Sequence, residues 1–178
     1  MIICAGRNEV FPFATPIGVG LVESAINLTR QCLFDKPEYL LFIGSAGSYG
    51  EHKVFDILES KRASNIELSF LTNSSYTPLD NVLESENKFA RNDTIVNSSN
   101  YISTNSELTK NFKEYGIGIE NMEYFSVLQV AKQFEIPVAG IFVVTNFTDE
   151  NAHEDFMKNH KVAMEKLTNY LVEKQIIK

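Results

Sequence analysis

Two carboxylates and a methionine lie together in the segment 119–125, which reads Ile-Glu-Asn-Met-Glu-Tyr-Phe. The segment opens a predicted helix over residues 122–134. A carboxylate in the first turn of a helix is stabilised by the helix dipole and can accept hydrogen bonds from two vicinal hydroxyls. Ribose presents such hydroxyls, so Glu123 is a candidate sugar ligand with Met122 beside it. A solvated first-turn glutamate and a core methionine would give the same pattern.

A glycine-rich segment, Gly-Ser-Ala-Gly-Ser-Tyr-Gly at 44–50, directly follows the apolar run Tyr39–Ile43. Glycines at the end of a buried strand let the backbone approach a ligand closely, although a tight turn would also need them. The segment matches neither the dinucleotide fingerprint nor a phosphate loop. A second turn, Thr15–Gly20, precedes the first predicted helix. It could present amides to an anion or pack against the sheet.

Asn146 lies in the turn Val144–Asp149, which ends another apolar run, Ala139–Val143. Its amide can donate and accept hydrogen bonds together, which suits the edge of a heterocycle such as a purine. Asparagine also begins many turns for backbone reasons, so the residue alone is weak support for a ligand.

The histidines and cysteines indicate no metal or redox site. Cys4 and Cys32 have apolar neighbours and no CxxC spacing, so we expect buried reduced thiols. His153 and His160 are seven residues apart on the last predicted helix, where charged neighbours favour a solvated face. His52 follows the glycine-rich segment and could reach a ligand, but nothing else supports that role.

Strands alternate with helices along the chain, and the apolar run Tyr39–Ile43 is typical of a strand buried on both faces. The polar stretch 72–92 reads as surface loop. The fold class is therefore α/β, a three-layer sandwich around a mixed, largely parallel sheet, in one domain over residues 1–178. The predicted strands are 39–43, 54–58, 66–70, 94–102, 117–119 and 138–145, and the predicted helices are 19–33, 106–115, 122–134 and 152–174.

Composition narrows the class of partner. The net charge of −7 argues against nucleic acid, which would require a clustered basic face, and favours a small molecule. The first ten residues contain only a short apolar start before Arg7 and Glu9, unlike a signal peptide. No window approaches the roughly 18 to 20 apolar residues that cross a membrane. We therefore expect a cytoplasmic protein with no membrane partner.

Four segments together resemble the purine nucleoside phosphorylase and methylthioadenosine nucleosidase superfamily, in order and over nearly the whole chain. They are Gly44-Ser45-Ala46-Gly47 for the family's GSAG or GSCG loop, residues 95–102 for the strand leading to a base-stacking aromatic, Asn121-Met122-Glu123 for the VEMEA motif, and Val143-Val144-Thr145-Asn146 for the strand ending in Ser-Asp or Thr-Asn. The resemblance implies a nucleoside phosphorylase-like fold, here of a shortened member.

The resemblance also implies roles for individual residues. Tyr101 would stack on the base, Met122 would pack against the sugar, and Glu123 would bind the ribose hydroxyls. Ser45, in the loop with Gly47, would face phosphate or the nucleophilic water. These five are the expected substrate-binding residues, and no cofactor or metal is expected.

Asn146 and Glu123 are the expected catalytic residues. Cleavage of the glycosidic bond passes through an oxocarbenium-like state, so the cationic sugar and the anionic leaving base must both be stabilised. Asn146 would contact the purine at N7. Relatives that handle adenine usually have Asp there, and an amide cannot deliver a proton, so a 6-oxopurine preference is expected. Phe42 stands where many phosphorylases have an arginine, which weakens the case for phosphate binding.

Two alignments of the N-terminus are open. The favoured one begins at the family's second strand, so that the opening strand and its glycine or glutamate loop are missing. The alternative puts residues 1–10 on the opening strand, and Glu9 would then match the water-activating glutamate of nucleosidases.

The leading hypothesis is a purine nucleoside phosphorylase of nucleotide salvage, a pentosyl- or glycosyltransferase with phosphate as possible co-substrate. A nucleosidase that uses water and a catalytically silent nucleoside-binding protein are the alternatives. The family's sites borrow residues across an isologous interface, so a homodimer or larger homo-oligomer is expected.

Overall fold

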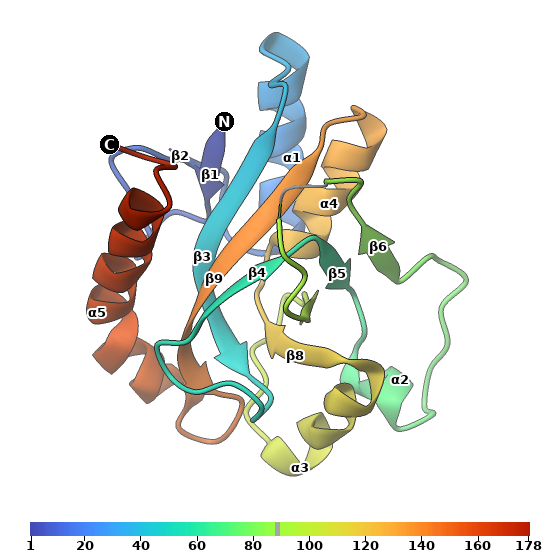
Figure 1. The fold of residues 1–178 in the computed structure, drawn as a ribbon. Coiled ribbons are helices and arrows are strands. Elements are labelled where there is room, and N and C mark those ends of the chain that lie inside the picture. The colour runs from blue at the N-terminus through green and yellow to red at the C-terminus, as the bar shows by residue number, and fades with distance from the viewer. Residues whose placement is uncertain (88–89) are drawn as a thin grey trace.

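A mixed, largely parallel β-sheet forms the centre of the computed structural model, which describes residues 1–87 and 90–178. Three parallel strands lie in the middle: β1 (Ile2–Cys4), β3 (Leu40–Ser48) and β9 (Val138–Phe147). The others are β2 (Thr15–Pro16), β4 (Ile57–Ser60), β5 (Arg62–Ser64), β6 (Val82–Glu84), β7 (Ile95–Asn97) and β8 (Ile117–Glu120). Within the described residues the order is β2-β1-β3-β8-β7-β5-β6, with β9 between β3 and β4 (Figure 1).

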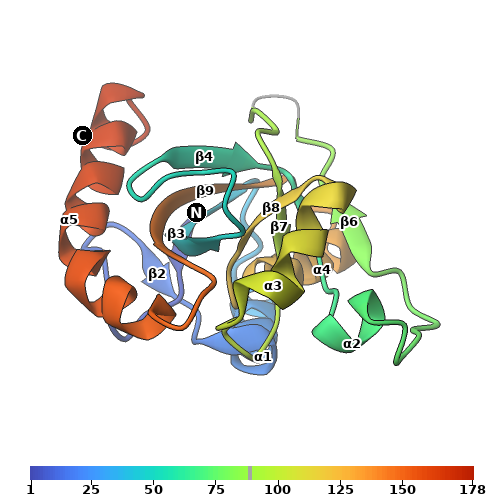
Figure 2. The same cartoon turned by 90° about the horizontal axis from the view of Figure 1, so that it is seen from below.

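Helices cover both faces of this sheet, which confirms the predicted α/β sandwich. One face carries α5 (Ala152–Glu173), and the other carries α1 (Gly20–Phe34) and α4 (Tyr124–Gln133), as Figures 1 and 2 show. Short helices lie at one end of the molecule: α2 (Leu68–Leu71), α3 (Ser106–Thr109) and the 3₁₀ helix η1 (Lys110–Tyr115).

The three layers arise because successive side chains along the central strands point to opposite faces of the sheet. In β3, Leu40 and Phe42 pack with the core beneath α1 and α4, whereas Leu41 and Ile43 pack with the core beneath α5. All four side chains are at most 6% exposed. The continuous apolar run is thus explained by burial on both faces.

The glycine-rich segment is not the turn that the sequence predicts. β3 continues through it to Ser48 and stays paired with β9, with a register shift between Ala46 and Gly47. Small residues are needed because side chains of neighbouring strands occupy the space above: a Cβ on Gly47 would lie 3.1 Å from Asn146 Nδ2.

Shorter elements were predicted less well. The predicted strand 66–70 is wrong, because α2 lies there and the strand is β5, at 62–64. The predicted loop 72–92 contains β6, and its residues 88–89 lie outside the described residues. The predicted strand 94–102 ends at Asn97, helix 106–115 is divided into α3 and η1, and α4 begins at Tyr124 instead of Met122.

The N-terminus corrects the favoured alignment. β1 is an integral strand, paired with β3 through Ile2 to Leu41 and Ile3 to Phe42. A strand therefore precedes α1 in the sheet, as the alternative placement of residues 1–10 requires. The loop that follows is closed by a bridge between Gly6 and Glu9, with Arg7 in the left-handed region at φ 55°.

Candidate active site

A cavity of about 280 Å³ opens at the ends of β1, β3, β8 and β9. Its wall brings together all the site residues expected from the sequence: Ser45, Gly47, Tyr101, Met122, Glu123 and Asn146. These residues come from segments up to a hundred positions apart. The ends of parallel strands meeting at one edge of the sheet explain the convergence.

Glu123 is held at the junction of two helices. It directly precedes α4, and its Oε1 accepts a hydrogen bond of 2.9 Å from the Gly20 N–H at the start of α1. The Thr15–Gly20 turn thus presents its last amide to the side chain of Glu123. Asn121 connects Glu123 to the end of β3. Its Oδ1 accepts the N–H of Glu123 over 3.0 Å, and its Nδ2 donates to the Ser45 carbonyl over 3.1 Å.

Burial, together with the nearby Glu9 carboxylate, raises the pKa of Glu123 to about 8 against the opposing hydrogen bonds from Gly20 and Asn121. Only 3% of the Glu123 residue surface is exposed. Its carboxyl group therefore retains a proton at neutral pH in the empty site.

Glu9 is the second buried carboxylate of the cavity, at 7% exposure. Its Oε1 accepts the Ser45 N–H over 3.0 Å. Burial raises the pKa of Glu9, while hydrogen bonds from Ser45 and the charge of His160 act in the opposite direction. Ser45, expected to face phosphate or water, thus faces a carboxylate of its own chain.

Asn146 lies at another wall of the cavity and is 6% exposed. Its Oδ1 accepts a hydrogen bond of 2.8 Å from the Thr145 hydroxyl, and its Nδ2 donates to the Phe147 carbonyl over 2.9 Å. Tyr101 borders the same cavity with 80% of its surface exposed.

Phe42 supplies no substitute for a phosphate-binding arginine. It is fully buried in the core and contacts Tyr124 and Phe142, with ring centroids 5.8 and 5.7 Å apart. Its side chain is absent from the cavity wall.

The start of α5 adds cavity residues that sequence reasoning missed. His153 and Phe156 line the cavity, and Phe156 stacks on the half-buried His160 at 5.4 Å between ring centroids. His153 is exposed, as expected for a solvated face, and also borders the cavity, whereas His160 is half-buried. The sequence signal for this part of the cavity was the i, i+3, i+7 spacing of His153, Phe156 and His160, which places them on one face of the helix. His52 is not part of the cavity wall.

Glu120 was also missed as a site residue. It lines the cavity three positions before Glu123, at the end of β8. The available signal was the charged residue directly after the apolar Ile117-Gly118-Ile119. A glutamate at the end of a buried strand is seldom a simple core residue, because Glu is rarely buried without a partner.

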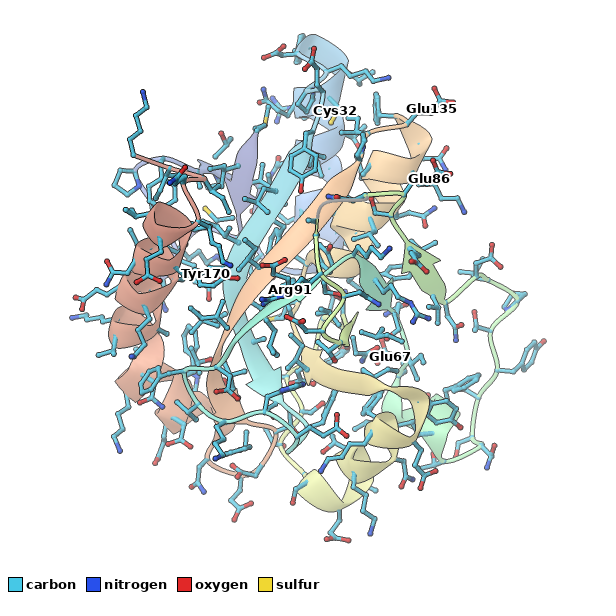
Figure 3. All side chains as sticks on the ribbon, in the orientation of Figure 1. Cys32, Glu67, Glu86, Arg91, Glu135 and Tyr170 are labelled. Carbon is cyan, nitrogen blue, oxygen red and sulfur yellow. The ribbon has the colours of Figure 1, made fainter. Side chains whose placement is uncertain are left out.

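A separate charged cluster lies outside the cavity and ties α5 to β4. Tyr170 and Arg91, both labelled in Figure 3, reach the carboxylate of Glu59. The Tyr170 hydroxyl donates over 2.7 Å, and Arg91 also pairs with Asp93 at 3.1 Å. The cluster connects structural elements, and its four residues are not among those that line the cavity.

Both cysteines are buried free thiols, as expected; Cys32, on α1, is labelled in Figure 3. Over residues 1–87 and 90–178, no three or more His, Cys, Asp or Glu residues are placed to hold a metal ion. In the same part of the chain, every helix is too short or too polar to cross a bilayer.

Comparison with known proteins identifies similar sequences and folds. Residues 92–174 match the model of the Phosphorylase superfamily. No curated protein matches the chain. Among solved structures, a variant of the Helicobacter pylori 5′-methylthioadenosine nucleosidase with 5′-methylthioadenosine in its active site superposes with a TM-score of 0.80 at 18% identity, over 97% of this chain and 95% of the other.

Two further structures have the same fold. A futalosine hydrolase mutant of Helicobacter pylori strain 26695 superposes with a TM-score of 0.79 at 17% identity, over 96% of this chain and 95% of the other. The 5′-methylthioadenosine/S-adenosylhomocysteine nucleosidase of S. pneumoniae gives 0.75 at 15% identity, over 96% and 95%. The chain has the nucleoside phosphorylase fold, and the superfamily resemblance drawn from its sequence is confirmed.

Proposed function

We propose that this protein is a nucleosidase that hydrolyses the N-glycosidic bond of a purine nucleoside, with Glu9 as the base that activates water. The observation that carries the proposal is the Glu9 carboxylate on the Ser45 amide, inside the cavity that also holds Glu123. A phosphate ion at Ser45 would lie against this carboxylate, and like charges at close range repel. A neutral water molecule meets no such penalty.

The two carboxyl groups have different roles in this mechanism. Glu123, which carries a proton at neutral pH, can donate to one ribose hydroxyl and accept from the other. Burial raises the pKa of Glu9, the hydrogen bonds from Ser45 oppose that rise, and in its ionised form Glu9 can take a proton from water. The water oxygen then bonds to C1′ as the bond from C1′ to N9 breaks.

The leaving base is stabilised at its far edge. Asn146 donates a hydrogen bond from Nδ2 to N7, where negative charge develops. Because an amide carries no proton to give, the departing base takes its proton from solvent. This step favours bases that leave readily as anions.

The similar structures support hydrolysis over phosphorolysis, since those reported above are named as nucleosidases and a hydrolase. Phosphorolysis, the leading hypothesis from the sequence, is the competing reaction. Nucleoside binding without turnover is a second candidate, which the amide of Asn146 in place of a proton donor favours.

A product assay distinguishes these three functions. Inosine, guanosine, adenosine and 5′-methylthioadenosine are incubated with the protein, with and without phosphate, and free base and sugar are quantified. We expect free base and free ribose at a rate independent of phosphate. Ribose 1-phosphate would identify a phosphorylase instead, and calorimetric binding without release of base would identify a silent binding protein.

A further inference from the structure

Two basic side chains line the cavity, and neither takes part in the proposed reaction. Arg7 belongs to the loop after β1, and His153 belongs to the first turn of α5. Among the described residues of the cavity wall, they are the only ones with basic side chains. Both are exposed, so they lie where the cavity opens to solvent. In a protein with a net charge of −7, basic groups gathered at a cavity indicate an anionic ligand.

The Arg7 guanidinium is available to such a ligand. Its ion pair with Glu23 joins Nη2 to Oε2 over 3.8 Å, with the two side chains 75% and 50% exposed. An ion pair this exposed contributes little to stability. Within residues 1–87 and 90–178 the guanidinium makes no hydrogen bond. Its N–H donors can therefore turn to an oxyanion, which arginine binds through two parallel hydrogen bonds.

The backbone at Arg7 also indicates a role for its side chain. The Glu9 N–H donates to the Gly6 carbonyl over 3.0 Å and closes a tight loop that contains Arg7. Arg7 has a φ of 55°, in the left-handed region where glycine, asparagine and aspartate are the usual residues. The conformation of the loop therefore does not account for an arginine. Residues held in this region concentrate at sites that bind ligands.

His153 presents a second free donor from a neighbouring element. Its ring has no hydrogen-bond partner in the described part of the chain. An imidazole donates an N–H in either protonation state. α5 packs against the N-terminal segment that carries Arg7, because Leu167 and Phe11 belong to one apolar cluster. The two basic side chains therefore come to the cavity from elements that contact each other.

Three carboxyl groups also line the cavity, and each accepts a hydrogen bond from elsewhere in the chain. They are Glu9, bonded by the Ser45 N–H, Glu123, bonded by the Gly20 N–H, and Glu120, bonded by the Tyr49 hydroxyl and the Ser103 N–H. Glu9 is 7% exposed, whereas the Arg7 side chain is 75% exposed. An anion bound by Arg7 thus lies at the opening, where solvent weakens the repulsion that disfavours phosphate at Ser45.

A nucleoside has three parts to be placed in the cavity: the base, the ring hydroxyls and the substituent at C5′. In the proposed function the base lies at Asn146 and Tyr101, and the hydroxyls lie at Glu123. The substituent at C5′ remains for the part of the wall that carries Arg7 and His153. We infer that this substituent carries an oxyanion, a phosphate or a carboxylate, which Arg7 binds through its guanidinium and His153 through its ring N–H. The inference rests on the proposed function and names the substrate class of that same site.

The experiment compares nucleosides that differ only at C5′. Inosine and adenosine are each tested with a 5′-hydroxyl, a 5′-monophosphate and a 5′-carboxylate, and release of free base is measured. The parent should have a kcat/KM about ten- to hundredfold higher for the anionic forms than for the neutral ones. Hydrolysis of the monophosphates should yield ribose 5-phosphate. The better substrate of the monophosphate and the carboxylate identifies the oxyanion that the site prefers.

Three variants assign this preference to residues. Arg7→Gln should reduce it by about tenfold or more, because a charge-assisted hydrogen bond is lost. His153→Phe keeps a ring without a donor and should reduce it by a smaller factor. Arg30→Gln, at an exposed position of α1 outside the cavity wall, removes the same charge and should keep the preference.

Several results would overturn the inference. A parent that cleaves neutral and anionic nucleosides equally well would show that the charge at C5′ is not read, and an unchanged preference in Arg7→Gln would exclude Arg7. Phosphate-dependent formation of ribose 1-phosphate that is lost in Arg7→Gln would assign the guanidinium to phosphate as a co-substrate. A parent that cleaves none of the compounds would contradict the proposed function alone. Calorimetry with the same compounds would then test Arg7 without turnover: tighter binding of an anionic form that is lost in Arg7→Gln supports the inference, and equal affinities, or no binding of any compound, refute it.

Discussion

The hydrolytic proposal depends most directly on Glu9. Glu9→Gln keeps an acceptor for the Ser45 N–H but is not basic enough to take a proton from water. Loss of a general base costs about 10² to 10⁴ in rate, so kcat should fall by this factor while nucleoside affinity changes much less. Release of free base and equilibrium binding are the measurements. The exposed Glu165→Gln on α5 is the control and should match the parent.

Asn146 sets the preference between bases from the opposite wall. Asn146→Asp supplies a carboxyl group that can carry a proton to N7 and accept from a 6-amino group. The ratio of adenosine to inosine turnover should rise by about tenfold or more. Asn169→Asp, at an exposed position of α5, is the control for added charge. An unchanged ratio would mean that Asn146 does not read the base.

The proton on Glu123 predicts a stability that depends on pH. A carboxyl group with a raised folded-state pKa stabilises the fold below its unfolded pKa of 4.5, and this contribution is lost as pH rises through about 8. The effect is on the order of 4 kcal/mol, and Glu9 acts in the same direction. Chemical denaturation between pH 5 and 9 should show declining stability, with a smaller decline in Glu123→Gln. Parallel profiles for the two proteins would contradict a buried proton at this position.

The residues that the sequence identified were those tied to strand and helix ends. Glu123 and Asn146 could be predicted because each follows or precedes a long apolar element whose end must lie at the sheet edge. Glu9 was assigned a role only in the alternative alignment and Glu120 was assigned none, because their placement depends on which strand lies beside which. Only the pairing of β1 and β8 with β3 brings both carboxylates to the cavity.

At the scale of elements, α1, β3, β9 and α5 were predictable because each has a long, periodic apolar pattern. β5, β6 and α2 have three or four residues each, too few for a period to distinguish strand from helix. The glycine-rich part of β3 was predicted as a turn because its extension depends on close contacts with β9 and β8, which local sequence does not reveal.

The start of α1 connects fold and site through Gly20. Its φ is +82°, and a Cβ there would lie 2.8 Å from Asn100 Oδ1, which accepts the Leu21 N–H. Gly20→Ala should therefore destabilise the protein by about 1 to 3 kcal/mol and weaken nucleoside binding, since the Gly20 N–H holds Glu123. Urea denaturation and ligand titration are the measurements.

Gly116→Ala is the matched control for Gly20. Gly116 also has a positive φ, +70°, but a Cβ there meets nothing within 4 Å. This variant should show backbone strain alone and leave nucleoside binding unchanged. If both substitutions changed nucleoside binding equally, the contact between Gly20 and Glu123 would have no specific role in the site.

At the scale of the whole molecule, one face of α1 is apolar and uncovered. Val22, Ile26 and Leu33 lie on the same side of the helix and are 62%, 55% and 69% exposed. A hollow lined by Val22, Ile26 and Asn100 shares Val19 with the active-site cavity. Exposed apolar side chains gathered beside a site are typical of an interface between subunits.

We therefore expect a homodimer, or a larger homo-oligomer, built through this face of α1. Ile26→Glu would place a charge in the buried centre of such an interface and should convert the assembly to monomer. Val162→Glu, at a 45% exposed position of α5, adds the same charge elsewhere and should leave the assembly intact. Sedimentation velocity at micromolar concentration measures both. A monomeric parent would remove the expectation of an assembly, and an Ile26→Glu protein that sediments like the parent would move the interface away from α1. Because the hollow adjoins the cavity, loss of the assembly should also raise the KM for nucleosides in Ile26→Glu and not in Val162→Glu.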